Sequence, residues 1–281
     1  MTQRLPEHQP DLDAYFQRIG YAGERSPTLA TLQAIHLRHA TAIPFENLTP
    51  FLRQTVHLDR AALQHKLVQS GRGGYCFEQN LLLHAVLHAL GFQVTGLAAR
   101  VRWNVPDEVV TARGHMLLRV ELDGQTYLAD VGFGGLTLTA PLALAPGRVQ
   151  PTPHEPFRII ADGDGYLMQA ETGQEWRSLY RFDLQQQYLP DYEVSNWYLS
   201  NHPSSHFVTG LMAARPDTDC RYALRNNQLT IHHLKGDSER RMLTTVAELR
   251  AVLEDAFHIT LPATSELDPA LQRLIEPSKQ V

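Results

Sequence analysis

The spacing of apolar residues changes at Gly91, and no other feature of this 281-residue chain constrains its fold as strongly. Before Gly91, apolar residues recur at helical spacing over residues 29–37 and 77–90. After it, β-branched and aliphatic runs bounded by turn signals are typical of strands. These strands are expected over residues 94–102, 115–122, 125–131, 157–160, 166–170 and 176–182. Helices followed by antiparallel strands predict an α+β fold in successive layers, not an alternating parallel-sheet fold.

The last part of the chain mixes both patterns. We expect a long connection over residues 141–156, which carry proline and glycine without periodicity, and an amphipathic helix within residues 183–200. Further elements are expected in the order strand, strand, strand, helix, over residues 207–212, 222–224, 228–233 and 246–257. The chain should therefore end in a mixed α/β unit.

Length and composition narrow the class of protein. A chain of 281 residues with 43% hydrophobic content exceeds the usual size of one domain, so two or three domains are expected. The net charge of -5, without basic runs, argues against nucleic acid or an anionic membrane as the main partner and favours a small substrate. Residues 1–6 lack the apolar core of a signal peptide, and no apolar run reaches membrane-spanning length. With only Cys76 and Cys220 as cysteines, we expect a reducing compartment, the cytoplasm.

Residues 72–80, Arg-Gly-Gly-Tyr-Cys-Phe-Glu-Gln-Asn, place Cys76 after a glycine-rich turn and at the start of an apolar helical segment. Unpaired backbone N–H groups and the positive end of the helix dipole stabilise a thiolate at such a position. A nucleophile and a small buried hydrophobe are both open interpretations of this stretch taken alone.

A second candidate group lies in the hairpin around Asp123-Gly124, a dipeptide that favours a two-residue turn. With that turn, Leu122 pairs with Gln125, and alternation of side chains puts His115 and Asp130 on one face as diagonal neighbours about 7–8 Å apart. A carboxylate in that position would orient the imidazole. The opposite face is nearly all apolar and is expected to be the core side. A surface hairpin whose polar face merely meets water is the alternative.

Five motifs then resemble the signatures of the arylamine N-acetyltransferases. They lie at residues 43–48 (Ile-Pro-Phe-Glu-Asn-Leu), 72–80, 129–135 (Ala-Asp-Val-Gly-Phe-Gly-Gly), 180–184 (Tyr-Arg-Phe-Asp-Leu) and 205–207 (Ser-His-Phe). The resemblance covers almost the whole chain. Leu-Thr-Leu-Thr-Ala-Pro at residues 136–141 makes it most similar to the bacterial N-hydroxyarylamine O-acetyltransferases.

The resemblance implies a catalytic triad of Cys76, His115 and Asp130, with no departure from the family pattern. It also implies a helical bundle over 1–90 carrying the cysteine, an antiparallel β-barrel over 91–190 carrying His and Asp, and an α/β lid over 191–281. These would surround a cysteine-protease-like catalytic core. The implied reaction is ping-pong acetyl transfer from acetyl-CoA, without a metal, to an aromatic amine, hydrazine or N-hydroxyarylamine. The oligomeric state, monomer or dimer, is left open by the resemblance.

Substrate-binding residues are implied in the same way. The loop 132–135 follows Asp130, and a glycine loop after a strand is by itself usually only a turn. The resemblance assigns CoA contacts to Phe133 and Gly134, walls of the acceptor and pantetheine cleft to Phe207 and Trp103, and a pocket-lining position to Phe45. Ordinary aromatic core is the alternative for these aromatic residues.

Glu46 and Arg72 lie in signature motifs of the helical part, and neither charge is expected to be buried unpaired. We predict an ion pair that positions the cysteine turn, with direct chemistry as the alternative. Three rival functions remain at this point. They are a transglutaminase-like cysteine hydrolase, a related amide synthase and a non-enzymatic binding module.

Overall fold

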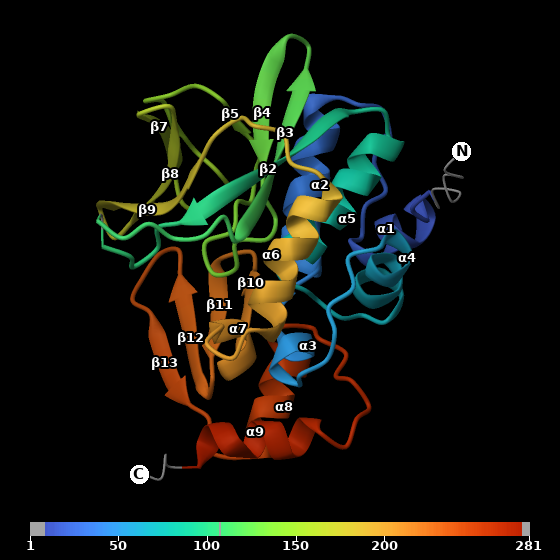
Figure 1. Ribbon diagram of the computed structural model, residues 1–281, viewed down its shortest axis with the longest axis vertical. Helices are drawn as coiled ribbons and strands as arrows, with labels where there is room; N and C mark the ends of the chain where they lie inside the picture. Colours follow the sequence, from blue (N-terminus) through green and yellow to red (C-terminus); the bar gives the residue numbers. More distant parts are fainter. Residues whose placement is uncertain (1–8, 107, 277–281) are drawn as a thin grey trace.

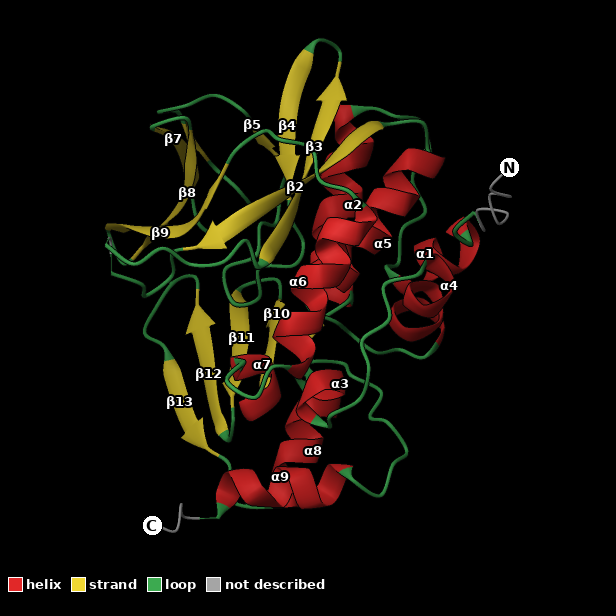
Figure 2. Ribbon diagram, viewed as in Figure 1, coloured by secondary structure: helices red, strands yellow, loops and turns green. Residues whose placement is uncertain are grey.

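The computed structural model describes residues 9–106 and 108–276. Helices, an eight-stranded sheet and a five-stranded sheet form three neighbouring groups, and the helices lie along one side of the eight-stranded sheet (Figures 1 and 2). This arrangement confirms the predicted α+β class. Among the described residues, none of the helices combines the length and the apolar character needed to span a membrane.

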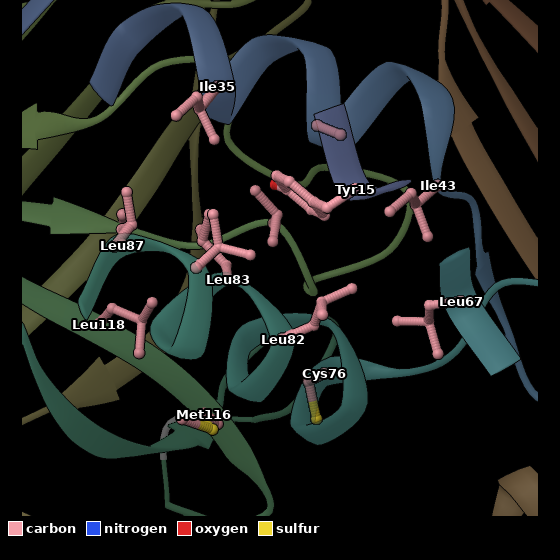
Figure 3. Close-up of a cluster of buried hydrophobic side chains, with 14 of the residues drawn as sticks. Tyr15, Ile35, Ile43, Leu67, Cys76, Leu82, Leu83, Leu87, Met116 and Leu118 are labelled. Atoms are coloured by element: carbon pink, nitrogen blue, oxygen red, sulfur yellow. The ribbon is translucent and has the colours of Figure 1, made fainter. Parts of the chain in front are cut away.

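The helical group is built on two long helices that pack face to face. Its elements are α1 (Leu12–Arg18), α2 (Leu29–Ala42), α3 (Leu48–Phe51), α4 (Arg60–Leu63), a π-helical segment (Gln64–Gln69) and α5 (Cys76–Ala89). Ile35 of α2 and Leu83 and Leu87 of α5 are fully buried in one cluster, in which Cys76 lies at one end (Figure 3). Gly91, with a φ of 90°, follows α5 and ends it, as predicted.

The central sheet is an antiparallel, nearly closed barrel. Its strands follow the order β5-β4-β3-β2-β9-β8-β7-β6. Their bounds are β2 Gln93–Val101, β3 His115–Leu122, β4 Gln125–Ala129, β5 Leu142–Ala143, β6 Val149–Gln150, β7 Phe157–Asp162, β8 Gly165–Thr172 and β9 Glu175–Phe182. The Gln150 side chain joins the two edge strands, because its Nε2 donates to Ala143 O (2.9 Å) and its Oε1 accepts from Ala143 N (2.8 Å). The prediction of an unbroken connection over 141–156 was therefore wrong, since β5 and β6 lie within it.

The hairpin register is as predicted, with Leu122 opposite Gln125 and Leu118 opposite Ala129. Asp123 and Gly124 both have positive φ, 50° and 74°, which fits a primed two-residue turn. The expectation of a single core face was wrong. Leu118 faces the helices, but Leu117, on the other face, is equally buried in the barrel interior. Both faces are covered because one packs on the helical layer and the other lines the interior of the nearly closed barrel.

The C-terminal group consists of a five-stranded antiparallel sheet and the helices that pack on it. The strand order is β1-β10-β11-β12-β13, with β1 Phe45–Glu46, β10 Met212–Pro216, β11 Cys220–Arg225, β12 Gln228–His233 and β13 Glu239–Met242. The helices α8 (Val246–Asp255) and α9 (Leu267–Ile275) cover it (Figure 1). Because β1 pairs with β10, the helical segment and the C-terminal part share one sheet.

Two helices that follow the barrel and precede β10 in the chain differ from the sequence predictions. The helix α6 (Leu189–Asn201) begins later than expected, and the predicted apolar residue Trp197 is 64% exposed. The predicted strand over 207–212 was wrong, because residues 206–209 form α7 (His206–Thr209). Ser205 begins this helix, with its Oγ accepting a hydrogen bond from the Phe207 backbone N (3.3 Å). The ends of the predicted outer domains, residues 1–8 and 277–281, lie outside the described residues.

Candidate active site

Cys76 is the first residue of α5 and is buried. Its Sγ lies 3.6 Å from the carbonyl oxygen of Gly114, the residue before His115. The glycine-rich turn therefore places the thiol at the start of β3, where the backbone of the barrel meets the helical layer. In this orientation the Cys76 thiol, carried by α5, lies next to His115, carried by the hairpin.

His115 and Asp130 are joined directly. His115 Nε2 lies 2.7 Å from Asp130 Oδ2, and the two side chains are 3% and 1% exposed. The second carboxylate oxygen, Oδ1, accepts hydrogen bonds from Asn80 Nδ2 and Gly132 N, both at 2.9 Å. Burial raises the pKa of Asp130, but the charge of His115 and these hydrogen bonds outweigh it and hold the pKa below its ordinary value.

The imidazole of His115 favours its charged form. Burial lowers the pKa of His115, yet the charge and hydrogen bond of Asp130 and the neighbouring Cys76 outweigh burial and raise the pKa to about 10. The ring is therefore an imidazolium at neutral pH, next to a thiol at a helix N-terminus.

Aromatic rings border this pair. The centroids of Phe133 and Tyr180 lie 5.2 Å and 4.8 Å from that of His115. Phe133 was predicted as a binding residue, whereas Tyr180 was not singled out. Tyr180 lies on β9 and is buried, and its position at the start of the signature motif 180–184 was the signal that could have found it.

The predicted pocket residues fall into two groups. Phe45 and Phe207 lie together, with ring centroids 6.1 Å apart, and Tyr75, directly before Cys76, lies 5.3 Å from Phe207. Gly134 lies against the Phe45 ring, since a Cβ built on it would be 3.6 Å away. Trp103 instead lines a hollow of about 250 Å³ with residues 102–105 and 175–178, where the Arg177 guanidinium lies 5.2 Å from its ring centroid.

Two buried ion pairs flank the cysteine turn. Arg72 Nε and Nη2 lie 2.9 Å and 2.7 Å from Glu46 Oε1, and the Leu48 backbone N donates to Glu46 Oε2 (2.6 Å). Burial raises the pKa of Glu46, but the Arg72 charge holds it below its usual value. The second pair, which sequence reasoning missed, joins Lys66 Nζ to Glu78 Oε1 at 2.6 Å, while Glu78 Oε2 accepts from the Tyr75 backbone N.

Two further residues support Asp130 and were missed from the sequence. Asn80 donates to Asp130, and its Oδ1 accepts from the Val131 backbone N (3.1 Å). It lies one turn after Cys76 on the same helix, so its position in the motif was a usable signal. His36 Nε2 accepts a hydrogen bond from the Asp130 backbone N (3.1 Å), and no local pattern connects residues so far apart in the chain. In the described part of the chain, no three His, Cys, Asp or Glu residues group together as candidate metal ligands.

Comparison with known proteins gives consistent matches along the chain. A family model described as N-acetyltransferase matches residues 28–266. The chain is 44% identical over 260 residues to an arylamine N-acetyltransferase of Mycobacterium tuberculosis, covering 91% of this chain and 92% of that protein. It is 38% identical over 248 residues to an arylamine N-acetyltransferase / N-hydroxyarylamine O-acetyltransferase of Salmonella typhimurium, covering 88% of each.

Solved structures agree with these relatives. The arylamine N-acetyltransferase of Mycobacterium marinum superimposes with a TM-score of 0.92 at 41% identity, covering 95% of this chain and all of that chain. The same enzyme in complex with CoA superimposes with a TM-score of 0.91 at 41% identity, covering 94% and 99% of the two chains.

Proposed function

We propose that this chain, which belongs to the arylamine N-acetyltransferase family, moves an acetyl group from acetyl-CoA to an aromatic amine through a thioester on Cys76. The observation that carries the proposal is the placement of Cys76, at the start of α5, beside the buried His115–Asp130 pair. A thiol in these surroundings can hold an acyl group between donor and acceptor.

In the first half-reaction, the Cys76 thiolate attacks the thioester carbonyl of acetyl-CoA. The tetrahedral intermediate collapses with cleavage of the bond to the CoA sulfur, and His115 gives its proton to the departing thiolate. Since Nε2 of His115 is held by Asp130, the proton is exchanged through Nδ1. The products are CoA as a free thiol and acetylated Cys76, with His115 neutral.

The second half-reaction needs His115 as a base. The first half-reaction leaves His115 neutral, because its proton has gone to the CoA thiol. Neutral His115 then accepts a proton from the amine as its nitrogen attacks the acetyl carbonyl. Collapse expels the Cys76 thiolate and restores the imidazolium. The Cys76 backbone N–H, on the first turn of α5, is one donor to the oxyanion.

Binding of the two substrates is assigned to the aromatic groups around the site. Phe45 and Phe207 form an apolar wall next to Tyr75 that suits an aromatic ring. Phe133 and Gly134 follow Asp130. Since the N–H groups of Gly132 and Phe133 donate to Asp130 and Thr137, the Gly134 N–H is proposed to approach the pyrophosphate of CoA. Trp103 is proposed as a further wall for the pantetheine chain, although it lines a separate hollow with residues of β9. Hydrazines and N-hydroxyarylamines are proposed as further acceptors, supported by the second activity in the name of the Salmonella relative.

The three segments 1–90, 91–190 and 191–281 are proposed as helical, barrel and lid domains. Three apolar clusters, one centred in each group of elements, support this division, although Leu48 and Phe51 belong to the C-terminal cluster and Met116 and Leu118 to the helical one. A cytoplasmic location is proposed because both cysteines are free, as expected in a reducing compartment.

The acetyl-enzyme provides the decisive test. Mixing the protein with acetyl-CoA should add one acetyl group, detected by mass spectrometry, to Cys76. The Cys76→Ala variant should lose the adduct, and the Cys220→Ala variant, which removes the other buried cysteine, should keep it. Loss of the acetyl group should then require an arylamine, hydrazine or N-hydroxyarylamine. Loss of the acetyl group at the same rate without any acceptor would favour a cysteine hydrolase. An adduct that forms only with longer acyl-CoAs would mean that acetyl-CoA is not the donor.

The Glu46–Arg72 pair is proposed to position the cysteine turn. Arg72→Ala leaves the fully buried Glu46 carboxylate without its partner, a change that typically costs about 3–5 kcal/mol. We expect a lower melting temperature and slower alkylation of Cys76 by iodoacetamide. Unchanged folding and unchanged alkylation would contradict the assignment.

A further inference from the structure

Arg221 is a buried arginine outside the site described above. It lies on β11 of the C-terminal sheet and is 1% exposed. Its guanidinium binds Glu155, in the segment between β6 and β7 of the barrel, through Nε (2.9 Å to each carboxylate oxygen) and Nη2 (2.6 Å to Oε2). Such a two-pronged pair fixes both distance and direction between the groups it joins.

The third arm of the same guanidinium reaches the loop that follows Asp130. Arg221 Nη1 donates to the carbonyl oxygen of Gly135 at 3.3 Å. One side chain of the C-terminal sheet therefore ties together its own strand, the barrel segment at Glu155 and the glycine loop, residues 132–135.

The glycine loop is held at its start by residues of the barrel itself. Gly132 N donates to Asp130 Oδ1 (2.9 Å), and Thr137 Oγ1 accepts from Phe133 N (3.3 Å) and donates to Asp130 O (3.1 Å). Further along, Thr137 N donates to Gly134 O (3.1 Å), and Arg221 supplies a contact at Gly135 that crosses from another sheet. Arg221 is thus placed to fix the backbone between Phe133 and Gly135.

We propose that Arg221 is a positioning residue for the donor substrate, holding the glycine loop in the shape that accepts CoA. The inference rests on the proposed function, which assigns this loop to CoA. The path from Arg221 to the site runs through the Gly135 carbonyl, and its other hydrogen bonds go to Glu155. Loss of the Arg221 side chain should therefore weaken acetyl-CoA binding and leave transfer of the acetyl group to Cys76 intact.

The test compares two acetyl donors in single turnovers. Acetyl-CoA uses the glycine loop, whereas p-nitrophenyl acetate is a small ester that carries no CoA. In Arg221→Met, the acetyl-CoA concentration that gives half the maximal rate of acetyl-enzyme formation should rise about tenfold, as expected for losing one hydrogen bond from a charged donor. The maximal rate and the rate with p-nitrophenyl acetate should stay unchanged. Arg221→Lys, which keeps the charge near Glu155 but lacks the three-armed fork, should show a smaller rise and carries the test if Arg221→Met does not fold.

A matched control separates positioning from stability. Arg215 on the adjacent strand β10 is also a buried arginine, bound to Asp217 (2.6 Å) and to the carbonyl oxygens of Ala256 and Thr41. Arg215→Met should lower the melting temperature without a selective loss of acetyl-CoA. The proposal is overturned if Arg221→Met slows both donors equally, or if Arg215→Met shows the same selectivity. Failure of the unmodified protein to form an acetyl-enzyme with either donor would instead refute the proposed function.

Discussion

Asn80 offers the sharpest test of the charge arrangement around Asp130. Its Nδ2 donates both to Asp130 Oδ1 (2.9 Å) and to Met116 O (2.8 Å), while its Oδ1 accepts from Val131 N. Asn80→Asp keeps the shape and the acceptor, but it replaces the donor by an oxygen that faces a carboxylate. If both carboxyl groups were ionised, two like charges would lie at this short distance in a fully buried site.

The size of the effect follows from that distance. Two unit charges 2.9 Å apart at an effective dielectric constant of about 20 repel by about 6 kcal/mol, which is about 4 pH units. The carboxyl group introduced at position 80 should therefore have a folded-state pKa near 8, against about 3.9 when unfolded. A pKa raised on folding means that stability present at low pH is lost as the pH rises toward the folded-state value. Relative to the unmodified protein, the variant should lose about 1.5 kcal/mol at pH 5 and about 4 kcal/mol at pH 7 from ionisation alone.

The assay is a series of thermal melts between pH 5 and pH 8.5. The gap in melting temperature between Asn80→Asp and the unmodified protein should widen with pH and level off near pH 8. Asn47→Asp is the control, because Asn47 also bridges two acceptors, the carbonyls of Phe207 and Gly210, and accepts from Met212 N. Burial raises the pKa of the introduced carboxyl group at both positions, but only position 80 faces a carboxylate. The Asn47→Asp gap should therefore level off at a lower pH. Levelling at the same pH in both variants, or a constant gap for Asn80→Asp, would refute an ionised Asp130.

Two further predictions concern close contact and acid stability. A Cβ on Gly132 would lie 2.7 Å from Cys76 Cα, so Gly132→Ala should displace the cysteine and slow acetyl-enzyme formation about 10–100-fold. Burial lowers the pKa of His36 to about 3 and that of His39 to about 4, so both are neutral when folded and take up protons on unfolding below pH 6.5. Urea unfolding at pH 5 should therefore show about 4 kcal/mol less stability than at pH 7 from these two groups, and His36→Gln, which keeps an acceptor but does not titrate, should lose about half of this pH dependence.

The sequence predicted the parts of the site that depend on local rules. The turn at Asp123-Gly124 determines the hairpin register, and the two-residue period of a strand then places His115 and Asp130 on one side. The glycine turn and the apolar run likewise predicted that Cys76 begins a helix. These inferences hold because each depends on residues that are neighbours in the chain or across one turn.

The parts that could not be predicted depend on contacts between distant segments. The contact of His36 with Asp130 crosses 94 residues, and that of Arg221 with Gly135 crosses 86. The Gln150 side chain links the two edge strands of the nearly closed barrel, where the strand pattern shows only a loop. The aromatic residue Trp197 looked like part of a buried helix face but is exposed, because hydrophobic periodicity does not tell which face of a helix finds a partner.

The buried charges around the site are better explained by geometry than by stability. Replacing a buried ion pair with apolar side chains of similar volume is often neutral or stabilising, so stability alone does not account for Glu46–Arg72 or Glu155–Arg221. Apolar contacts are non-directional, whereas an arginine bound to a carboxylate fixes both a distance and an orientation. Each pair joins separate segments next to the proposed reacting groups, the first linking β1 to the cysteine turn and the second linking β11 to the barrel and the glycine loop. We infer that these pairs set the approach of Cys76 and the donor, so that breaking one should alter reactivity or donor binding beyond what the loss of stability explains.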